Sequence, residues 1–414
     1  MEVSRSYQAN LAILQEKFQR ETWNEVFWSK FAGFASENYD NGQGVNGMPT
    51  GNVVTVYTEF DKQGRDHMLV PFLKHLTEMP VYGDTVLAGT GEKQTIDFLR
   101  VYINQVRKAV EALSGNMSNQ RIKLYNMIEK AMPQLKELLS QAENIHAWQA
   151  IYEGASANIT GAQTAECPGL QKRYHPNFYY VSAAKTITAV GTEKYTKTAA
   201  NLDTAEDAVD AGATFIISSD IVDKAIIKAR NLRIPQIVTA SGYKYYLCVV
   251  SPEQMYQLKN DSKIYSANRE AFSGKMLDSP ELQGFNEKLY YSGAVFVTDD
   301  TGIRGWDATN KNFAGSGGWL EPFVYSAGTG NHCMVLLGKN AMAKGMASNW
   351  AFTKELYDHF NVKEIGANAI YGYNRMEYAT PATESTAFAV AASEGVVSAT
   401  PLINNSSLIL MTNV

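Results

Sequence analysis

The stretch QLKELLSQAENIHAWQAIYEG, from Gln134 to Gly154, is the longest part of the sequence whose apolar residues repeat with the period of an α-helix. The apolar stripe consists of Leu135, Leu138, Leu139, Ala142, Ile145 and Tyr152. The residues predicted to face solvent are Lys136, Glu137, Ser140, Glu143 and Asn144. Pro133 suits a first helical turn, and Gly154 suits a left-handed C-terminal residue. The sequence therefore predicts a core helix over residues 134–154, with Trp148 beside its stripe.

The segments next to this helix are less regular. A second helix is predicted over residues 118–132, with Ser118 as its N-cap and Pro133 as the residue that breaks or kinks it. Residues 155–212 are rich in Thr, Ala and Gly and are expected to form short strands and loops.

The N-terminal segment carries a dense aromatic patch on a predicted helix over residues 9–34. The patch consists of Trp23, Phe27, Trp28, Phe31 and Phe34. A short terminal helix cannot hide this much apolar surface by itself, so the patch must pack on its own domain or on a neighbouring subunit. A Gly/Asn-rich link follows at residues 36–51.

Two strands and a polar excursion are predicted next. Residues 53–60 and 68–73 are apolar and rich in β-branched or aromatic side chains, which is typical of strands. Residues 77–94 are polar and glycine-rich, and residues 96–110 are expected to return as a strand and then a helix. The pattern predicts an extended two-stranded ribbon.

Beyond residue 212 the sequence alternates between helical and strand patterns. The predicted helices cover residues 220–232, 252–258, 261–276 and 340–346. The predicted strands cover residues 213–217, a pair within 235–251 that turns at Ser241–Gly242, 293–298 and 369–378. Residues 301–330 are expected to form a glycine-rich loop, and residues after Ala379 an extended tail that lies on another surface.

No catalytic, cofactor-binding or metal-binding motif is present. His332–Cys333 is the nearest pairing of a nucleophile with a base, but neighbouring residues of a strand point apart. The segment AGTGEK at 88–93 lacks the spacing of a phosphate-binding loop. Asp299–Asp300 is expected to be an exposed turn rather than a cation site. We therefore expect a protein that is not an enzyme.

Composition bounds the class of protein. A chain of 414 residues is expected to form two or more subdomains. The net charge of −5 argues against tight binding of nucleic acid through many phosphate contacts. The three cysteines, Cys167, Cys248 and Cys333, fit neither a disulfide framework nor a zinc site and are expected to be reduced thiols of an intracellular protein. Neither a signal peptide nor a membrane span is expected.

The order of these pieces resembles the major capsid protein of tailed bacteriophages, which has the Hong Kong 97-type fold. Particular strings resemble the major capsid family of podovirus-type phages: GDTVLAGTGEKQTIDFLRVYINQVRKAV at 83–110, GYKYYLCVVSPEQMYQLKND at 242–261, SPELQGFNEKLYYSGAVFVTDD at 279–300, MVLLGKNAMAKG at 334–345 and DHFNVKEIGANAIYGYNRMEY at 358–378. The resemblance covers about two thirds of the chain and includes no catalytic signature.

This resemblance implies an α+β fold with an N-terminal arm, an extended β-hairpin loop, a peripheral domain with a long spine helix, and an axial domain. The implied boundaries are 1–50 for the arm, 51–112 for the loop, 113–199 for the peripheral domain, 200–350 for the axial domain, 351–378 for a return to the peripheral domain, and 379–414 for a C-terminal tail. The aromatic residues Trp23, Phe27, Trp28, Phe31 and Phe34 are then expected to contact another subunit.

The implied function is that of a major capsid subunit that self-assembles into an icosahedral shell enclosing double-stranded DNA. Its partners would be copies of itself in pentameric and hexameric capsomers, with DNA touched only weakly. Scaffolding, portal and decoration proteins are further possible partners, and assembly is expected in the host cytoplasm before the subunit resides in the virion. The alternatives are a bacterial nanocompartment (encapsulin-like) shell protein and a soluble α+β enzyme or ligand-binding protein.

Overall fold

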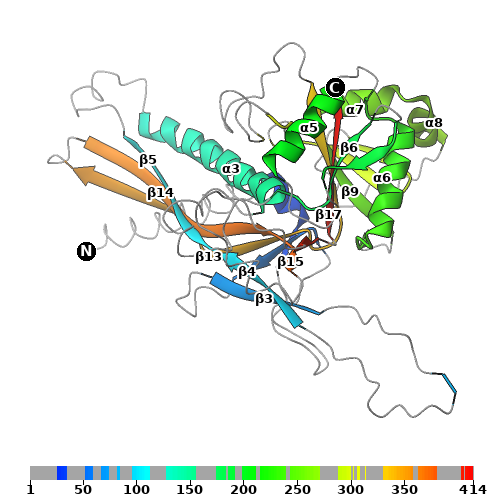
Figure 1. The fold of residues 1–414 in the computed structure, drawn as a ribbon. Coiled ribbons are helices and arrows are strands. Elements are labelled where there is room, and N and C mark those ends of the chain that lie inside the picture. Colours follow the sequence, from blue (N-terminus) through cyan, green and yellow to red (C-terminus); the bar gives the residue numbers. More distant parts are fainter. Residues whose placement is uncertain are drawn as a thin grey trace.

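A computed structural model of the chain describes residues 26–34, 52–58, 67–73, 82–83, 96–111, 127–154, 174–182, 185–191, 198–210, 215–238, 243–270, 288–299, 302, 305–307, 313, 330–357, 362–379, 402–404 and 406–413. The fold is mixed α and β, as the sequence predicts, and is built on two large sheets. The long helix α3, Met127–Glu153, runs along one sheet and reaches the other with its C-terminal half (Figure 1).

The first sheet has five strands in the order β1-β2-β13-β14-β5. Their bounds are Ala32–Phe34 for β1, Val54–Tyr57 for β2, Met342–Tyr357 for β13, Val362–Arg375 for β14 and Asn104–Glu111 for β5. The two long strands β13 and β14 form an antiparallel pair, and β2 lies parallel to β13. Helix α3 lies along β14 and β5 and covers one face of this sheet (Figure 1).

The second sheet has eight strands in the order β10-β11-β9-β12-β17-β6-β7, with β8 paired to β9. The strands cover Lys288–Tyr291 for β10, Ala294–Thr298 for β11, Lys244–Val250 for β9, Asn331–Leu337 for β12, Ser407–Asn413 for β17, Phe178–Val181 for β6, Ile187–Ala189 for β7 and Ile237–Val238 for β8. The C-terminal strand β17 lies in the middle, antiparallel to β12 and parallel to β6.

Helices cover both faces of the eight-stranded sheet. On β9, for example, Leu247 and Val249 face one hydrophobic cluster and Cys248 and Val250 face another. The first cluster includes helix α5, Ala199–Asp210, and extends past α3 to the five-stranded sheet. The second includes α6, Ser219–Asn231, α7, Pro252–Asn260, and α8, Ser262–Glu270. Central strands buried on both faces explain the continuous apolar runs in the sequence.

Smaller elements complete the described part of the chain. A short 3₁₀ helix, η1, spans Phe27–Phe31 and leads directly into β1. Strands β3, His67–Leu73, and β4, Ile96–Tyr102, pair antiparallel, which confirms the predicted two-stranded ribbon. Strands β15, Tyr378–Ala379, and β16, Leu402–Ile403, form a second small pair.

Several local predictions are confirmed because their signals are local. The predicted pair within 235–251 is formed by β8 and β9, with its turn outside the described residues. Helix α7 begins with Pro252 and is capped by Ser251, whose side chain accepts a hydrogen bond from the backbone of Gln254 while the Gln254 side chain bonds the Ser251 backbone. The predicted helix at 220–232 is α6.

The predicted break at Pro133 is wrong. Residues 127–153 form one continuous helix that contains Pro133. Pro133 is solvent-exposed, so water can hydrogen-bond the carbonyl that loses its helical partner. The predicted C-terminal end is confirmed: Gly154 has a φ of 88° and its N–H donates to the carbonyl of Ala150.

Two predicted helices are strands. Residues 104–111 form β5 on the edge of the five-stranded sheet, and residues 342–346 open β13. Asn340, with a φ of 55°, makes the turn into β13, whose first residues pair with β2 on one side and β14 on the other. Pairing with β14, and for β13 also with β2, overrides the weak helical pattern of these segments.

Within residues 155–212 the predicted short strands are confirmed by β6 and β7, but one part of this region and the end of the tail were predicted wrongly. Residues 199–210 form helix α5, where short strands and loops were expected. Of the predicted strand at 213–217, the described part makes only a bridge between Ile216 and Asn413. Residues 407–413 do not lie on another surface, because β17 is a buried central strand of the eight-stranded sheet.

The predicted domain boundaries remain predictions, but the sheets group some segments differently. Strands β6 and β7, at 178–189, pair into the same sheet as the strands of 200–350. The first part of β13, at 342–350, instead belongs to the five-stranded sheet with 351–378.

Candidate functional site: the buried polar contacts of helix α3

The residues that could suggest catalysis are structural in this fold. Cys333 faces the hydrophobic cluster around α3, whereas His332 Nδ1 lies 2.6 Å from Ser251 Oγ at the start of α7. The prediction that these neighbours point apart is therefore confirmed. Burial raises the pKa of both Cys248 and Cys333, which disfavours a thiolate at either position.

Other candidate motifs are either buried in structural contacts or lie outside the described residues. Among the described residues, no group of three or more His, Cys, Asp or Glu side chains could hold a metal ion. The AGTGEK segment and Cys167 lie outside the described residues. No helix in the described part of the chain is long and apolar enough to span a membrane.

A densely connected polar group lies on α3 and is the carboxylate of Glu143. It forms an ion pair with Lys344 of β13, and both side chains are at most 4% exposed. Its oxygens also accept hydrogen bonds from Trp350 Nε1 (2.9 Å) and Tyr373 Oη (2.9 Å). This carboxylate accepts from three donors and joins α3 to the two long strands of the five-stranded sheet.

Aromatic rings enclose the cation of this pair. Lys344 Nζ lies 5.6 Å from the ring centroid of Tyr371 and 5.5 Å from that of Tyr373. Burial lowers the pKa of Lys344, and the Glu143 carboxylate opposes that shift. Burial, and then Glu143, raise the pKa of both tyrosines, so each hydroxyl stays a hydrogen-bond donor.

The next residue of α3 makes the matching contact with the other sheet. Asn144 Nδ2 and, one turn later, Trp148 Nε1 donate to Asp299 Oδ2, over 3.2 and 2.7 Å. Asp299 directly follows β11 and is only 7% exposed, so the expectation of an exposed turn is wrong. A Cβ at Gly302 would overlap the Trp148 indole, which explains glycine at that position.

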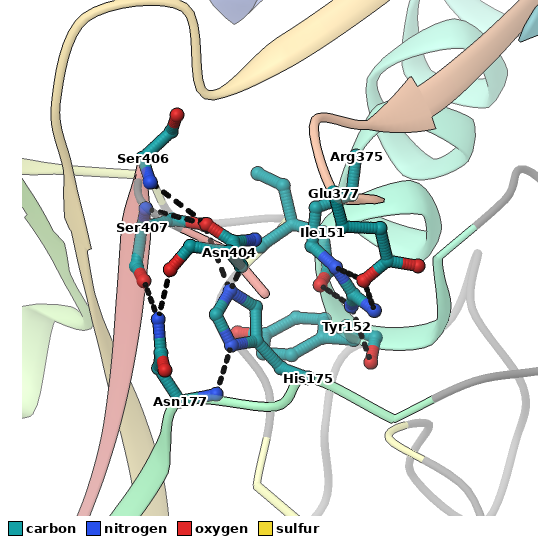
Figure 2. Close-up of polar contacts among 9 residues, drawn as sticks. All are labelled: Ile151, Tyr152, His175, Asn177, Arg375, Glu377, Asn404, Ser406 and Ser407. Atoms are coloured by element: carbon teal, nitrogen blue, oxygen red, sulfur yellow. Dashed lines mark hydrogen bonds and ion pairs between the residues drawn. The ribbon is translucent and has the colours of Figure 1, made fainter. Parts of the chain in front are cut away.

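The C-terminal end of α3 is held by a buried arginine (Figure 2). Arg375, at the end of β14, donates from Nη1 to the carbonyls of Ile151 (2.7 Å) and Tyr152 (3.4 Å). Its Nε and Nη2 both donate to Glu377 Oε2, over 2.9 and 2.6 Å. The cation therefore satisfies helix carbonyls that lack intrahelical partners.

A second network beside it holds the C-terminal strand (Figure 2). The backbone N–H of Asn177 donates to His175 Nδ1 (3.1 Å), so the proton of a neutral ring lies on Nε2, which can donate to Ser407 Oγ (2.8 Å). Asn177 Nδ2 donates to the carbonyls of Asn404 (2.6 Å) and Ser407 (3.0 Å). Asn404 Oδ1 accepts from the backbone N–H groups of Ser406 and Ser407. These bonds fix the point at which β17 enters the sheet.

Helical periodicity did not predict this site, because it places the polar residues of α3 in solvent. Ser140, Glu143 and Asn144 are 5%, 1% and 6% exposed. Periodicity assigns polar residues to the wet face of a helix, but α3 is covered on several sides. The sequence signal for the site was the run of Glu143 and Asn144 followed by Trp148. The partners of these residues lie about 150 to 230 residues away in the sequence.

The aromatic arm residues predicted to contact another subunit differ in how far their own subunit buries them. Trp28 and Phe31 are 0% and 5% exposed within their own subunit. Trp28 packs against Trp148 with ring centroids 4.9 Å apart, and Phe27 lies 6.5 Å from the same ring. Trp23 and the side chain of Phe34 lie outside the described residues. The expected contact with another subunit therefore stays a prediction for Trp23, Phe34 and the partly exposed Phe27, whereas Trp28 and Phe31 are covered by their own chain.

A known protein family matches nearly the whole chain. The matching family is described as phage capsid protein, and it matches residues 10–398. No curated protein matches the chain.

Solved structures share the fold at low sequence identity. The capsid of Ralstonia phage GP4 is similar with a TM-score of 0.61 and 16% identity, over 94% of this chain and 90% of that one. The head of Helicobacter pylori bacteriophage KHP40 gives 0.55 and 11%, over 94% and 90%. The capsid of cyanophage Pam1 gives 0.53 and 15%, over 91% and 96%.

Removing the Glu143 carboxylate should destabilise the subunit strongly. Glu143→Leu leaves a buried ammonium, an indole N–H and a phenol without their acceptor, and we expect a loss of about 3–5 kcal/mol in the free energy of unfolding. Lys344→Met should cost less, because Glu143 keeps two donors, and the double variant should cost less than the sum. Urea unfolding measures all three, with Lys263→Met in the exposed Lys263–Asp220 pair as the control expected to change little. Strictly additive losses would contradict the coupling.

Removing the Trp28 side chain should also act on the subunit rather than only on assembly. Trp28→Ala leaves a cavity against Trp148, and we expect a loss of about 3–5 kcal/mol in the free energy of unfolding. Tyr256→Ala on α7 is the matched control, since Tyr256 is 68% exposed. A Trp28→Ala subunit as stable as the control in denaturant titrations would place Trp28 outside the subunit core.

Proposed function

The chain belongs to the phage capsid protein family, and on this premise we propose that its copies assemble into an icosahedral shell that encloses double-stranded DNA. It is a structural protein, a major capsid subunit of the virion. The observation that carries the proposal is the family match over residues 10–398.

The subunit's construction supports this role. The buried contacts of Glu143 and Asp299 fix α3 to both sheets, so the sheets are held together as one body. A shell repeats one interface geometry many times, and a subunit of fixed internal geometry lets those repeats close. Such a subunit can contribute many modest contacts that add up to a stable container.

The two halves of the subunit are given different places in this shell. We assign the five-stranded sheet with α3 to the peripheral domain and the eight-stranded sheet to the axial domain near the five-fold and six-fold centres. Residues 1–50 are proposed as an arm and 51–112 as an extended loop that reach neighbouring subunits, except for η1, β1, β2 and β5, which belong to the subunit's own core and five-stranded sheet. Trp23, Phe27 and Phe34 are the arm residues proposed to contact another subunit, since Trp28 and Phe31 are already covered within their own chain.

The proposed partners follow from the shell. Copies of the chain form pentameric and hexameric capsomers in the host cytoplasm, with scaffolding, portal and decoration proteins as further partners. The net charge of −5 supports only weak contact with the packaged DNA, because few phosphates can be neutralised. No specific observation favours a nanocompartment shell or a soluble enzyme.

The purified subunit is expected to form capsomers or closed shells. Sedimentation velocity across a range of concentrations, followed by negative-stain microscopy, should show rings or shells because surfaces in the arm and loop need neighbours. Protein cargo in place of nuclease-protected DNA, in particles isolated from lysed host cells, would support the nanocompartment alternative. A compact monomer at every concentration would contradict the proposal.

A further inference from the structure

The two faces of the eight-stranded sheet carry helices of opposite charge. Helix α5, AANLDTAEDAVD, has four acidic residues and no basic residue. It packs on one face, whereas α6 packs on the other, as Figure 1 shows. Asp207 and Thr204 are exposed on the outer side of α5.

The negative charge of α5 is concentrated within the subunit. Glu206 is 7% exposed, and within the described residues its Oε2 has no hydrogen-bond partner. Burial first, and then the carboxylates of Asp210, Asp207, Asp203 and Asp307, raise the pKa of Glu206 to about 7. From the facing strand β12, Asn331 supplies only a neutral amide, at 3.4 Å from Glu206 Oε1. These five acidic groups repel one another. A cationic surface packed over them would attract them and offset that repulsion.

The opposite face offers such a surface. Lys224, Arg230 and Arg233 are exposed on α6 and just beyond it. Asp220, at the start of α6, is already paired with Lys263 at 2.7 Å, so the acidic end of this helix is balanced within the subunit. Between the cations lies Ile227, which is 57% exposed, and α7 and α8 of the same face expose Tyr256 (68%) and Tyr265 (61%).

We propose that the acidic face of α5 in one subunit lies against the basic and apolar face of α6 in the next subunit of a capsomer. This inference rests on the proposed function, since it names the surfaces by which copies of this chain meet in a ring. The occupant of each face is therefore a second copy of the chain.

The placement of the two faces favours this occupant. A ring of identical subunits needs two different complementary surfaces on each copy, because each subunit touches a neighbour on either side. Helices α5 and α6 lie on opposite faces of one sheet and have opposite charge, which meets that requirement. A two-fold contact through α5 would instead bring carboxylates against carboxylates, which is unfavourable.

Charge reversal on each face tests the proposal. Thr204→Lys with Asp207→Lys makes α5 basic, and Lys224→Glu with Arg230→Glu makes α6 acidic. Each pair alone should raise the protein concentration needed for ring formation at least about tenfold, because like charges then meet. All four substitutions on one chain should restore rings. Sedimentation velocity, negative-stain class averages and circular dichroism provide the readouts.

A mixture of the two reversed subunits gives a sharper result. Subunits with basic α5 and subunits with acidic α6 pair favourably only in alternation, so a 1:1 mixture should form six-membered rings and no five-membered rings. The chain carrying all four substitutions should form both, as the parent does. Ring sizes are counted from the class averages.

A matched control separates the failure of this inference from failure of the proposed function. Thr353→Lys with Glu355→Lys likewise replaces a threonine and an acidic residue at exposed positions, here on β13, and should leave ring formation unchanged. If the parent chain forms no rings or shells, the proposed function fails. If the parent forms rings and the folded α5 and α6 variants form them equally well, or if the mixture forms five-membered rings, the proposed contact is overturned.

Discussion

Two neighbouring residues of helix α3 must each find a buried partner, and these partners come from different sheets. The Glu143 carboxylate forms an ion pair with Lys344 and accepts hydrogen bonds from Trp350 and Tyr373, all in the five-stranded sheet. Asn144 donates to Asp299, which directly follows strand β11 of the eight-stranded sheet. Because an unpaired buried charge or amide is costly, neither sheet can move away from α3 without breaking such a contact. The fixed relation between the two halves follows from this constraint, and a shell subunit requires it.

Elements with local signals could be predicted from the sequence. Residues 134–153 show helical periodicity and end at Gly154, and Ser251 with Pro252 marks the start of α7. The antiparallel pair β3–β4 follows from two apolar runs separated by a polar excursion. Sequence segments that resemble the phage major capsid family linked these elements to a capsid fold. The family match over residues 10–398 confirms that resemblance. Local chemistry and a recognisable order of elements were enough for the fold class.

Features that depend on distant partners could not be predicted. Residues 342–346 have a helical sequence pattern, but they form a strand because β2 and β14 pair with them on either side. Residues 407–413 were predicted as part of a tail, because their own sequence does not indicate that they pair with β12 and β6. Glu143 follows the polar pattern of a wet helix face, and its burial is visible only once Lys344 is placed beside it. Helical periodicity therefore could not predict the buried polar site, since its contacts join residues about 150 to 230 positions apart in the sequence.

Native-state hydrogen exchange at increasing denaturant concentration tests the role of α3 most directly. The buried contacts of Glu143 and Asp299 join the two sheets through one helix, so backbone amides of β14 and of β12 and β17 should share one opening free energy, equal to that of global unfolding. If the amides of one sheet exchanged through a separate opening of lower free energy while the other sheet stayed protected, the two halves would be independent units and the account would be wrong.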